Sequence, residues 1–242
     1  DLDAHSEESL LDFCRSLRDT VSAKSENLLN VSVGLYTMET SKLFISPNRE
    51  LDQNYSWVNG MIGVVWQENG KTVTHRAGEN ESTLSAVLEK LPNTVDKLLH
   101  EAHMLSTAKP MIPGEYDIVT DTEMTGLIAH EAFGHGVEMD MFVKDRALAK
   151  EYVGKYVASP IVNMRDGAAA TLSAGSYFFD DEGVLAGDTQ IIRDGILVTG
   201  ISDLTSALEL GTAPTGNGRR ESSRRKAYAR MTNTFIEPGS DT

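Results

Sequence analysis

Two dipeptides restrict the folds open to this chain more than any other feature. Asn69-Gly70 joins the apolar and aromatic run 57–66 to the strand-like run 72–76, and Asp194-Gly195 joins two later strand-like runs. Asn-Gly and Asp-Gly favour the tight turns with positive φ that connect antiparallel strands. The sequence therefore predicts two β-hairpins and, with them, antiparallel sheets.

Helical spacing of apolar residues marks the stretches around the first hairpin. Ser6 is expected to cap a first helix whose apolar positions continue to Leu17. The stretch 83–105 returns to helical spacing, and Pro92 is expected to divide it into two helices or to kink one. Runs of strands and helices follow each other without strand–helix–strand alternation. The predicted fold class is therefore α+β, with antiparallel sheets and packed helices.

A linker is predicted at 109–114, where two prolines and a glycine lie within six residues. We place a domain boundary near it, between an N-terminal α+β domain at 1–110 and a second domain at 111–242. The second domain is expected to carry a strand at 116–120, a helix opened by Asp121 or Thr122, a charged helix near 138–150, and a helix at 203–210 that stops at Gly211.

Composition narrows the classes of function. The formal net charge of −14 opposes general binding to nucleic acid, because phosphates attract basic surfaces. The apolar runs are too short to cross a bilayer, so no membrane association is expected. The single cysteine, Cys14, excludes an internal disulfide, and the cytoplasm is the expected location.

The stretch from His130 to Glu138 combines histidines and a glutamate with an apolar helical run. His130 and His135 are five residues apart, so on a regular helix they point about 140° away from each other and cannot share one metal ion. Gly134 and Gly136 flank the second histidine, and glycine can leave a helix through left-handed conformations. We expect the helix to end near residue 133 and the chain to fold His135 back toward His130, which places the metal motif at the end of a helix.

Glu131 directly follows the first histidine, as in the H-E-x-x-H zinc peptidases. A carboxylate beside a metal but not bound to it can take a proton from the metal-bound water, whose pKa the metal lowers. The alternative is a structural role, in which the histidine and the glutamate are half buried and the glycines only stop the helix.

The residues His130–Asp140 resemble the H-E-x-x-x-H-G-x-E-x-D signature of the TldD/PmbA family of metallopeptidases, once called modulators of DNA gyrase. The resemblance is specific over about half of the chain and is closer to the TldD side of the family. Four further stretches carry it: Pro113-Gly114-Glu115-Tyr116, Phe179-Asp180-Asp181-Glu182-Gly183, the tract from Ala213 to Ser222, and Arg230-Met231-Thr232-Asn233-Thr234.

The resemblance implies that His130 and His135 bind zinc (Zn2+) and that Glu131 is the catalytic general base. It also implies cleavage of small or unstructured peptides and pairing with a TldE/PmbA-type partner subunit, with a homo-oligomer as the other expected assembly. Family members are longer, and their third metal ligand is a cysteine well beyond the motif. No cysteine follows the motif here, so we expect the chain to be incomplete at its C-terminal side.

Two acidic residues could take part in the site. Glu138 lies three residues after His135 and could complete a His2Glu zinc site, although a role in orienting a histidine is more usual for such a carboxylate. Asp140 is a weaker candidate for either role.

Six basic residues lie between Arg219 and Arg230, against one acid. One interpretation is a patch for nucleic acid, but no nucleic-acid motif accompanies it and no such partner is expected. A second is a mobile loop that lines the peptide site, where Arg219 or Arg220 binds substrate carbonyls or a carboxyl terminus. A third is a solvated loop, or an anchor to an acidic surface elsewhere in the oligomer.

The sequence thus predicts a zinc-dependent peptidase of the H-E-x-x-x-H type. The absence of the distant cysteine indicates that this chain by itself could be inactive. The competing hypothesis is a catalytically inactive protein-binding or regulatory subunit of the gyrase-modulator kind.

Overall fold

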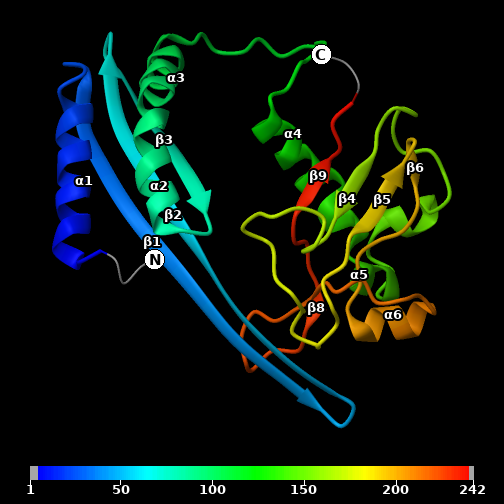
Figure 1. The fold of residues 1–242 in the computed structure, drawn as a ribbon. Coiled ribbons are helices and arrows are strands. Elements are labelled where there is room, and N and C mark those ends of the chain that lie inside the picture. Colours follow the sequence, from blue (N-terminus) through cyan, green and yellow to red (C-terminus); the bar gives the residue numbers. More distant parts are fainter. Residues whose placement is uncertain (1–4, 240–242) are drawn as a thin grey trace. The chain divides into compact units, whose positions relative to one another are not determined.

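The computed structural model describes residues 5–239, which lie in two compact units (Figure 1). The first unit comprises Asp1–Thr40 and Asn54–Tyr116, and the second comprises Ser41–Gln53 and Asp117–Thr242. The segment Ser41–Gln53 is the tip of a long hairpin whose two arms belong to the first unit. The domains 1–110 and 111–242 stay a prediction, because a compact unit is not by itself an independently folding domain.

The sheet of the first unit is a three-stranded meander. Its strands are β1 (Leu28–Ser46), β2 (Arg49–Glu68) and β3 (Lys71–Glu81), in that order. Asn69 and Gly70 turn the chain between β2 and β3 with φ values of 52° and 79°. The hairpin predicted from this dipeptide is confirmed, because both residues adopt the positive φ that the tight turn requires.

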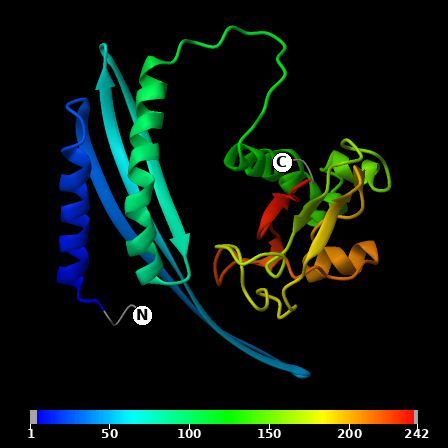
Figure 2. The same cartoon turned by 45° about the horizontal axis from the view of Figure 1, so that its top comes forward.

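Helices cover one face of this sheet (Figures 1 and 2). Helix α1 (Glu7–Ser22) begins at Ser6, whose hydroxyl accepts a hydrogen bond from the Ser9 N–H at 3.2 Å. Helices α2 (Leu84–Lys90) and α3 (Val95–Thr107) are separated by a 3-10 turn that starts at Leu91-Pro92. The apolar sides of all three helices pack on alternate residues of β2. Together they form one core: Leu17, Val21, Val58, Ile62, Val64, Trp66, Leu84, Val87, Leu98 and Ala102.

The second unit contains two small antiparallel sheets. One has the order β6-β5-β4-β9 and the other pairs β7 with β8. Asp194 and Gly195 turn between β5 and β6 with φ values of 50° and 78°, which confirms the second predicted hairpin. The fold class is therefore α+β, as predicted. The strands are β4 (Met164–Asp166), β5 (Thr189–Arg193), β6 (Ile196–Leu197), β7 (Gly218–Arg219), β8 (Tyr228–Ala229) and β9 (Thr234–Ile236).

Two sequence-based predictions for the second unit are wrong. Residues 116–120 are not a strand, because no neighbouring strand in the described chain pairs with them, and an isolated strand leaves its backbone without partners. The single helix expected near 138–150 is divided into α5 (Met139–Val143) and a 3-10 turn (Leu148–Tyr152). Asp145, with a φ of 55°, interrupts the right-handed path between them.

Two further helices complete the second unit. Helix α4 (Thr122–Ile128) leads into the histidine motif, and helix α6 (Leu204–Leu210) ends at Gly211 with a φ of 65°, as predicted. In the buried core, Ala129 and Val137 pack with the apolar residues of β4, β5 and β6. These two residues bracket the motif, so both of its ends are anchored. Within the described chain no helix combines the length and the apolar character that crossing a membrane requires.

Candidate metal centre

The histidine motif lies where α4 changes its helical winding. After Ile128 the chain continues as a π-helix over Ala129–Gly134 and then as a 3-10 turn over His135–Val137. The His135 N–H donates to the His130 carbonyl, five residues back. This wider turn brings residues five apart to the same side of the helix, where residues four apart lie in an α-helix. The two imidazole rings consequently meet edge to face, with centroids 4.8 Å apart and an interplanar angle of 88°.

The histidines meet, but not by the expected route. Gly134 has φ −53° and ψ −58°, which is right-handed helix rather than a left-handed exit. The reason for a glycine here is space: a Cβ at this position would lie 2.0 Å from the Sδ atom of Met231. Met231 follows β8 and is buried in the core of the second unit. The close approach of that distant segment, rather than a helix stop, accounts for Gly134.

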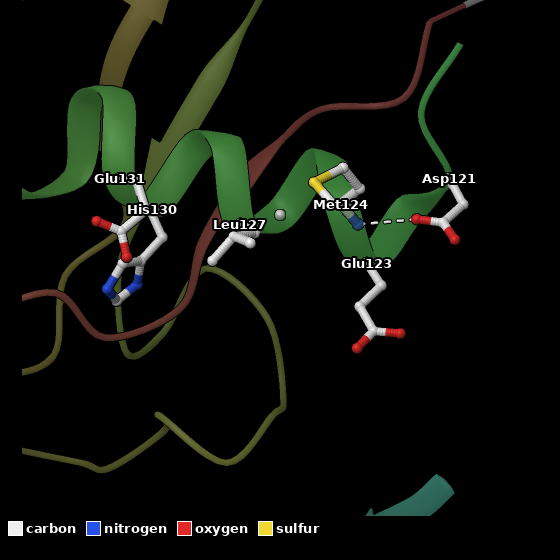
Figure 3. A pocket seen from close by; sticks show the side chains of 7 residues that line it. Asp121, Glu123, Met124, Leu127, His130 and Glu131 are labelled. Carbon is white, nitrogen blue, oxygen red and sulfur yellow. Dashed lines mark hydrogen bonds between the residues drawn. The ribbon is translucent and has the colours of Figure 1, made fainter. Parts of the chain in front are cut away.

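His130, Glu131 and His135 can together offer ligand atoms to one ion. One nitrogen or oxygen from each residue lies within 4.8 Å of the others, and all three side chains are exposed. Within residues 5–239 no other group of three histidine, cysteine or acidic residues is gathered in this way. Two imidazoles and a nearby carboxylate fit the donor preferences of zinc. A close view of the pocket along this helix shows the Glu131 carboxylate beside the His130 ring (Figure 3).

Glu138 contacts the Nδ1 side of the His135 ring. One carboxylate oxygen lies 3.3 Å from Nδ1 of His135, and the other accepts a hydrogen bond from Nη1 of Arg230 at 3.0 Å. Burial raises the pKa of the Glu138 carboxyl, whereas Arg230 and His135 oppose the rise. If Nδ1 of His135 carries the proton, it donates to this carboxylate, and Nε2 is then free to face a ligand. These contacts support the orienting role for Glu138 over direct ligation.

Asp140 is a second acidic residue near Arg230, the arginine that binds Glu138. It is buried, and Oδ2 accepts a hydrogen bond from Lys144 Nζ at 2.8 Å. Its Oδ1 has no hydrogen-bond partner among the described residues and lies 3.7 Å from Nη1 of Arg230. Asp140 is therefore placed to attract the Arg230 guanidinium, and it does not belong to the group formed by His130, Glu131 and His135.

Two hollows adjoin the histidines. One, of about 550 Å3, runs along α4 and is lined by Asp121, Glu123, Met124, Gly126, Leu127, His130 and Glu131 (Figure 3). The other, of about 480 Å3, is lined by His130, His135, Glu138, Arg219, Arg220, Glu221, Tyr228, Arg230 and Met231. The second hollow thus brings Arg219 and Arg220, singled out in the sequence, to the same cavity as both histidines.

Sequence reasoning missed the contribution of Tyr228, Arg230 and Met231. They come from β8 and the residues that follow it, and they line the cavity that holds both histidines. The agreement of Arg230–Thr234 with the family was a usable signal. It did not show that Arg230 binds Glu138 or that Met231 packs against Gly134, because those contacts join segments far apart in sequence.

Two aspartates that the family resemblance includes also act through tertiary contacts. Asp180 accepts a hydrogen bond from the Gly218 N–H at 2.8 Å, and Asp181 accepts one from the Arg220 N–H at 2.8 Å. Asp181 also pairs with Lys42 at the hairpin tip, which belongs to the second unit. These carboxylates hold the backbone that carries the cavity's arginines.

Comparison with known proteins agrees with this geometry. Residues 113–242 match the family described as the PmbA/TldA metallopeptidase C-terminal domain. A metalloprotease of Methanocaldococcus jannaschii is 30% identical over 88% of this chain and 48% of its own length. A metalloprotease TldD homolog of Haemophilus influenzae is 28% identical over 98% of this chain and 51% of its own length. A zinc metalloprotease TldD homolog of Saccharolobus solfataricus is 34% identical over 52% of this chain and 28% of its own length.

Solved structures share the fold. A Thermotoga maritima protein, solved as a candidate modulator of a DNA gyrase, superposes with a TM-score of 0.84 at 20% identity over 100% of this chain and 54% of its own. TldE from Thermococcus kodakarensis gives 0.69 at 17% identity over 96% of this chain and 52% of its own. The chain spans about half the length of the Methanocaldococcus and Haemophilus relatives, at 48% and 51%. Its sequence and fold agree on one assignment: the chain belongs to the TldD/PmbA family of metallopeptidases.

Proposed function

We propose that this chain belongs to a zinc-dependent peptidase that hydrolyses small or unstructured peptides. The observation that carries the proposal is the turn over residues 129–134, which gathers the ligand atoms of His130, Glu131 and His135 beside a cavity. A regular α-helix would separate the two histidines, so this winding has a direct consequence for metal binding. The names of the relatives, which include metalloproteases and a zinc metalloprotease, support the same chemistry.

The proposed roles follow from the contacts. His130 and His135 would hold the ion, and Glu138, 3.3 Å from Nδ1 of His135, would orient that imidazole. Zinc, when bound, supplies an activated water and polarises the scissile carbonyl. Glu131 accepts the proton of the attacking water and can return it to the leaving amine.

The third protein ligand is not assigned to this chain. Glu138 is already bound to His135 and Arg230, so direct ligation would require it to give up a charged partner while buried. The resemblance implies a cysteine further along in longer family members, and Cys14, the only cysteine here, belongs to the first helix. The proposed site in this chain therefore depends on the two histidines.

The proposal extends to assembly and location. The likeness in fold to a TldE protein supports pairing with a TldE/PmbA-type subunit, with a homo-oligomer as the other arrangement. The single cysteine and the family resemblance support a cytoplasmic location.

A second candidate function is a catalytically inactive binding subunit. One observation favours it: a shared fold with a protein solved as a candidate DNA gyrase modulator. The gathered His130, Glu131 and His135 favour the peptidase instead, because a binding subunit has no need of a base beside two metal ligands.

The test combines metal content with hydrolysis. After equilibration with zinc and washing, elemental mass spectrometry should find about one zinc per wild-type chain and loss of zinc in His130→Ala. Glu131→Ala should retain zinc but lose hydrolysis of an unstructured peptide. Hydrolysis that survives Glu131→Ala contradicts the proposed mechanism. A wild-type chain that holds zinc but does not hydrolyse peptides favours the inactive subunit.

A further inference from the structure

The cavity beside the histidines contains two acidic side chains, and each already faces an arginine. Glu138 accepts a hydrogen bond from Arg230 at 3.0 Å. Glu221 lies 3.7 Å from the Nε atom of Arg225. The negative charges that line the cavity are thus balanced by partners within the protein.

Arg219 and Arg220, in contrast, line the cavity without an ion pair to any described carboxylate. Each donates one hydrogen bond to a backbone carbonyl: Arg219 Nη1 to that of Met231 at 3.0 Å, and Arg220 Nη1 to that of Arg225 at 2.8 Å. A guanidinium carries five N–H donors in a planar fork. Both side chains are therefore steadied by one contact and keep further donors for an anionic ligand.

Hydrogen bonds already order the backbone that carries these arginines before any ligand binds. Gly218 N–H donates to Asp180 and Arg220 N–H to Asp181, each at 2.8 Å, and the Asp181 N–H donates back to the Gly218 carbonyl. A Cβ at Gly218 would lie 2.4 Å from the Glu182 Oε2 atom, so a side chain there would have to displace the Glu182 carboxylate. A site whose backbone is ordered before the ligand arrives loses less entropy on binding.

We propose that Arg219 and Arg220 form a subsite for a carboxylate of the peptide, next to His130 and His135. The inference rests on the proposed function, because it takes the ligand of the cavity to be a peptide. The planar carboxylate matches the guanidinium fork, and its source is either the peptide's C-terminus or an acidic side chain. A nucleic acid is disfavoured, because the two unpaired arginines lie in a concave cavity of a chain with a net charge of −14. The subsite selects peptides that present a carboxylate near the bond to be cut.

The experiment measures binding, so that it does not depend on turnover. Three peptides share one otherwise uncharged sequence and carry a neutral dansyl label: one has a free C-terminal acid, one has a C-terminal amide, and one is an amide in which a single internal residue is replaced by aspartate. Fluorescence anisotropy reports their affinity for the Glu131→Ala chain. The free acid or the aspartate peptide should bind about tenfold more tightly than the plain amide, which is the magnitude of a charged hydrogen bond at a partly exposed site.

Variants locate the effect. The preference should disappear in Arg219→Gln/Arg220→Gln and persist in Arg193→Gln/Arg224→Gln, which removes the same charge from exposed positions outside the cavity. Arg219→Lys/Arg220→Lys keeps the charge but loses the fork, so it should retain part of the preference and also checks that folding is not the cause.

The outcomes separate the possibilities. Tighter binding of the free acid identifies the C-terminus as the source, and tighter binding of the aspartate peptide identifies an acidic side chain. Equal binding of all three peptides overturns the subsite, and so does an equal loss in the Arg193/Arg224 control. Tighter binding of a short single-stranded oligonucleotide that is lost in Arg219→Gln/Arg220→Gln also overturns it. A carboxylate preference in a chain whose wild type does not cleave peptides refutes the proposed function and leaves the subsite intact.

Discussion

Gly134→Ala tests the explanation of how the two histidines come together. The added Cβ would lie 2.0 Å from the Sδ atom of Met231, whereas apolar atoms ordinarily stay about 3.5–4.0 Å apart. The overlap is therefore about 1.5 Å or more. Met231 is only 8% exposed and packs with Ala129 and Val137, so it cannot simply rotate into solvent. Either Met231 leaves its place in the core or the wide turn is displaced.

The expected magnitude combines two opposing effects. Overpacking a core costs about 1–3 kcal/mol, while replacing a helical glycine with alanine gains about 1 kcal/mol. Subtracting the gain from the cost, we expect Gly134→Ala to lower the free energy of unfolding by up to about 2 kcal/mol. Gly126→Ala on α4 is the matched control, because a Cβ there meets nothing within 4 Å and should leave stability unchanged or slightly raised.

The assays are urea unfolding and zinc retention. Gly134→Ala should lose stability and at least about tenfold in zinc affinity, because displacement of the turn separates the histidines. In Gly134→Ala/Met231→Ala the methionine is absent, so the combined loss of stability should fall short of the sum of the single losses by about 1 kcal/mol or more. The reasoning is refuted if Gly134→Ala behaves like Gly126→Ala in both assays, or if the double variant shows additive losses.

Three further predictions concern the acidic side chains around the site. Glu138→Gln should weaken zinc retention about tenfold to a hundredfold, measured by competition with a chelator, because an amide orients the neighbouring imidazole less firmly; retention equal to wild type would contradict that role. Asp180→Asn should lower the free energy of unfolding in urea by about 1–3 kcal/mol, because the new NH2 group would take the place of Oδ2 and cannot accept the hydrogen bond from the Gly218 N–H. An unchanged unfolding midpoint would show that Asp180 does not hold this backbone. Burial raises the pKa of Glu182, so its contribution to stability is fully present below its ordinary value near 4.5 and is lost as the pH rises through the raised one. Glu182→Gln keeps an acceptor for the Leu204 N–H and should therefore become more stable relative to wild type as the pH rises above about 4.5, whereas a constant difference across that range would contradict the shift.

Local structure was readable because its causes are local. Asn69-Gly70 and Asp194-Gly195 turn as predicted, since a positive φ is a property of those residues and of the tight turn itself. Ser6 caps α1 through an N–H three residues away. The strand predicted at 116–120 failed for the opposite reason: a strand needs a neighbour, and the pattern of one segment does not contain it.

The sequence by itself determined the α+β class and the candidate residues of the site, because residue types, their spacing and their turn preferences are all contained in the chain. Only the tertiary structure decided how the motif is arranged. The wide turn that unites His130 and His135 lies against Met231, a residue from a distant segment that leaves no room for a side chain at Gly134. The contact of Arg230 with Glu138 likewise exists only after folding. Contacts between remote segments depend on the packing of the whole unit, and spacing along the chain does not encode them.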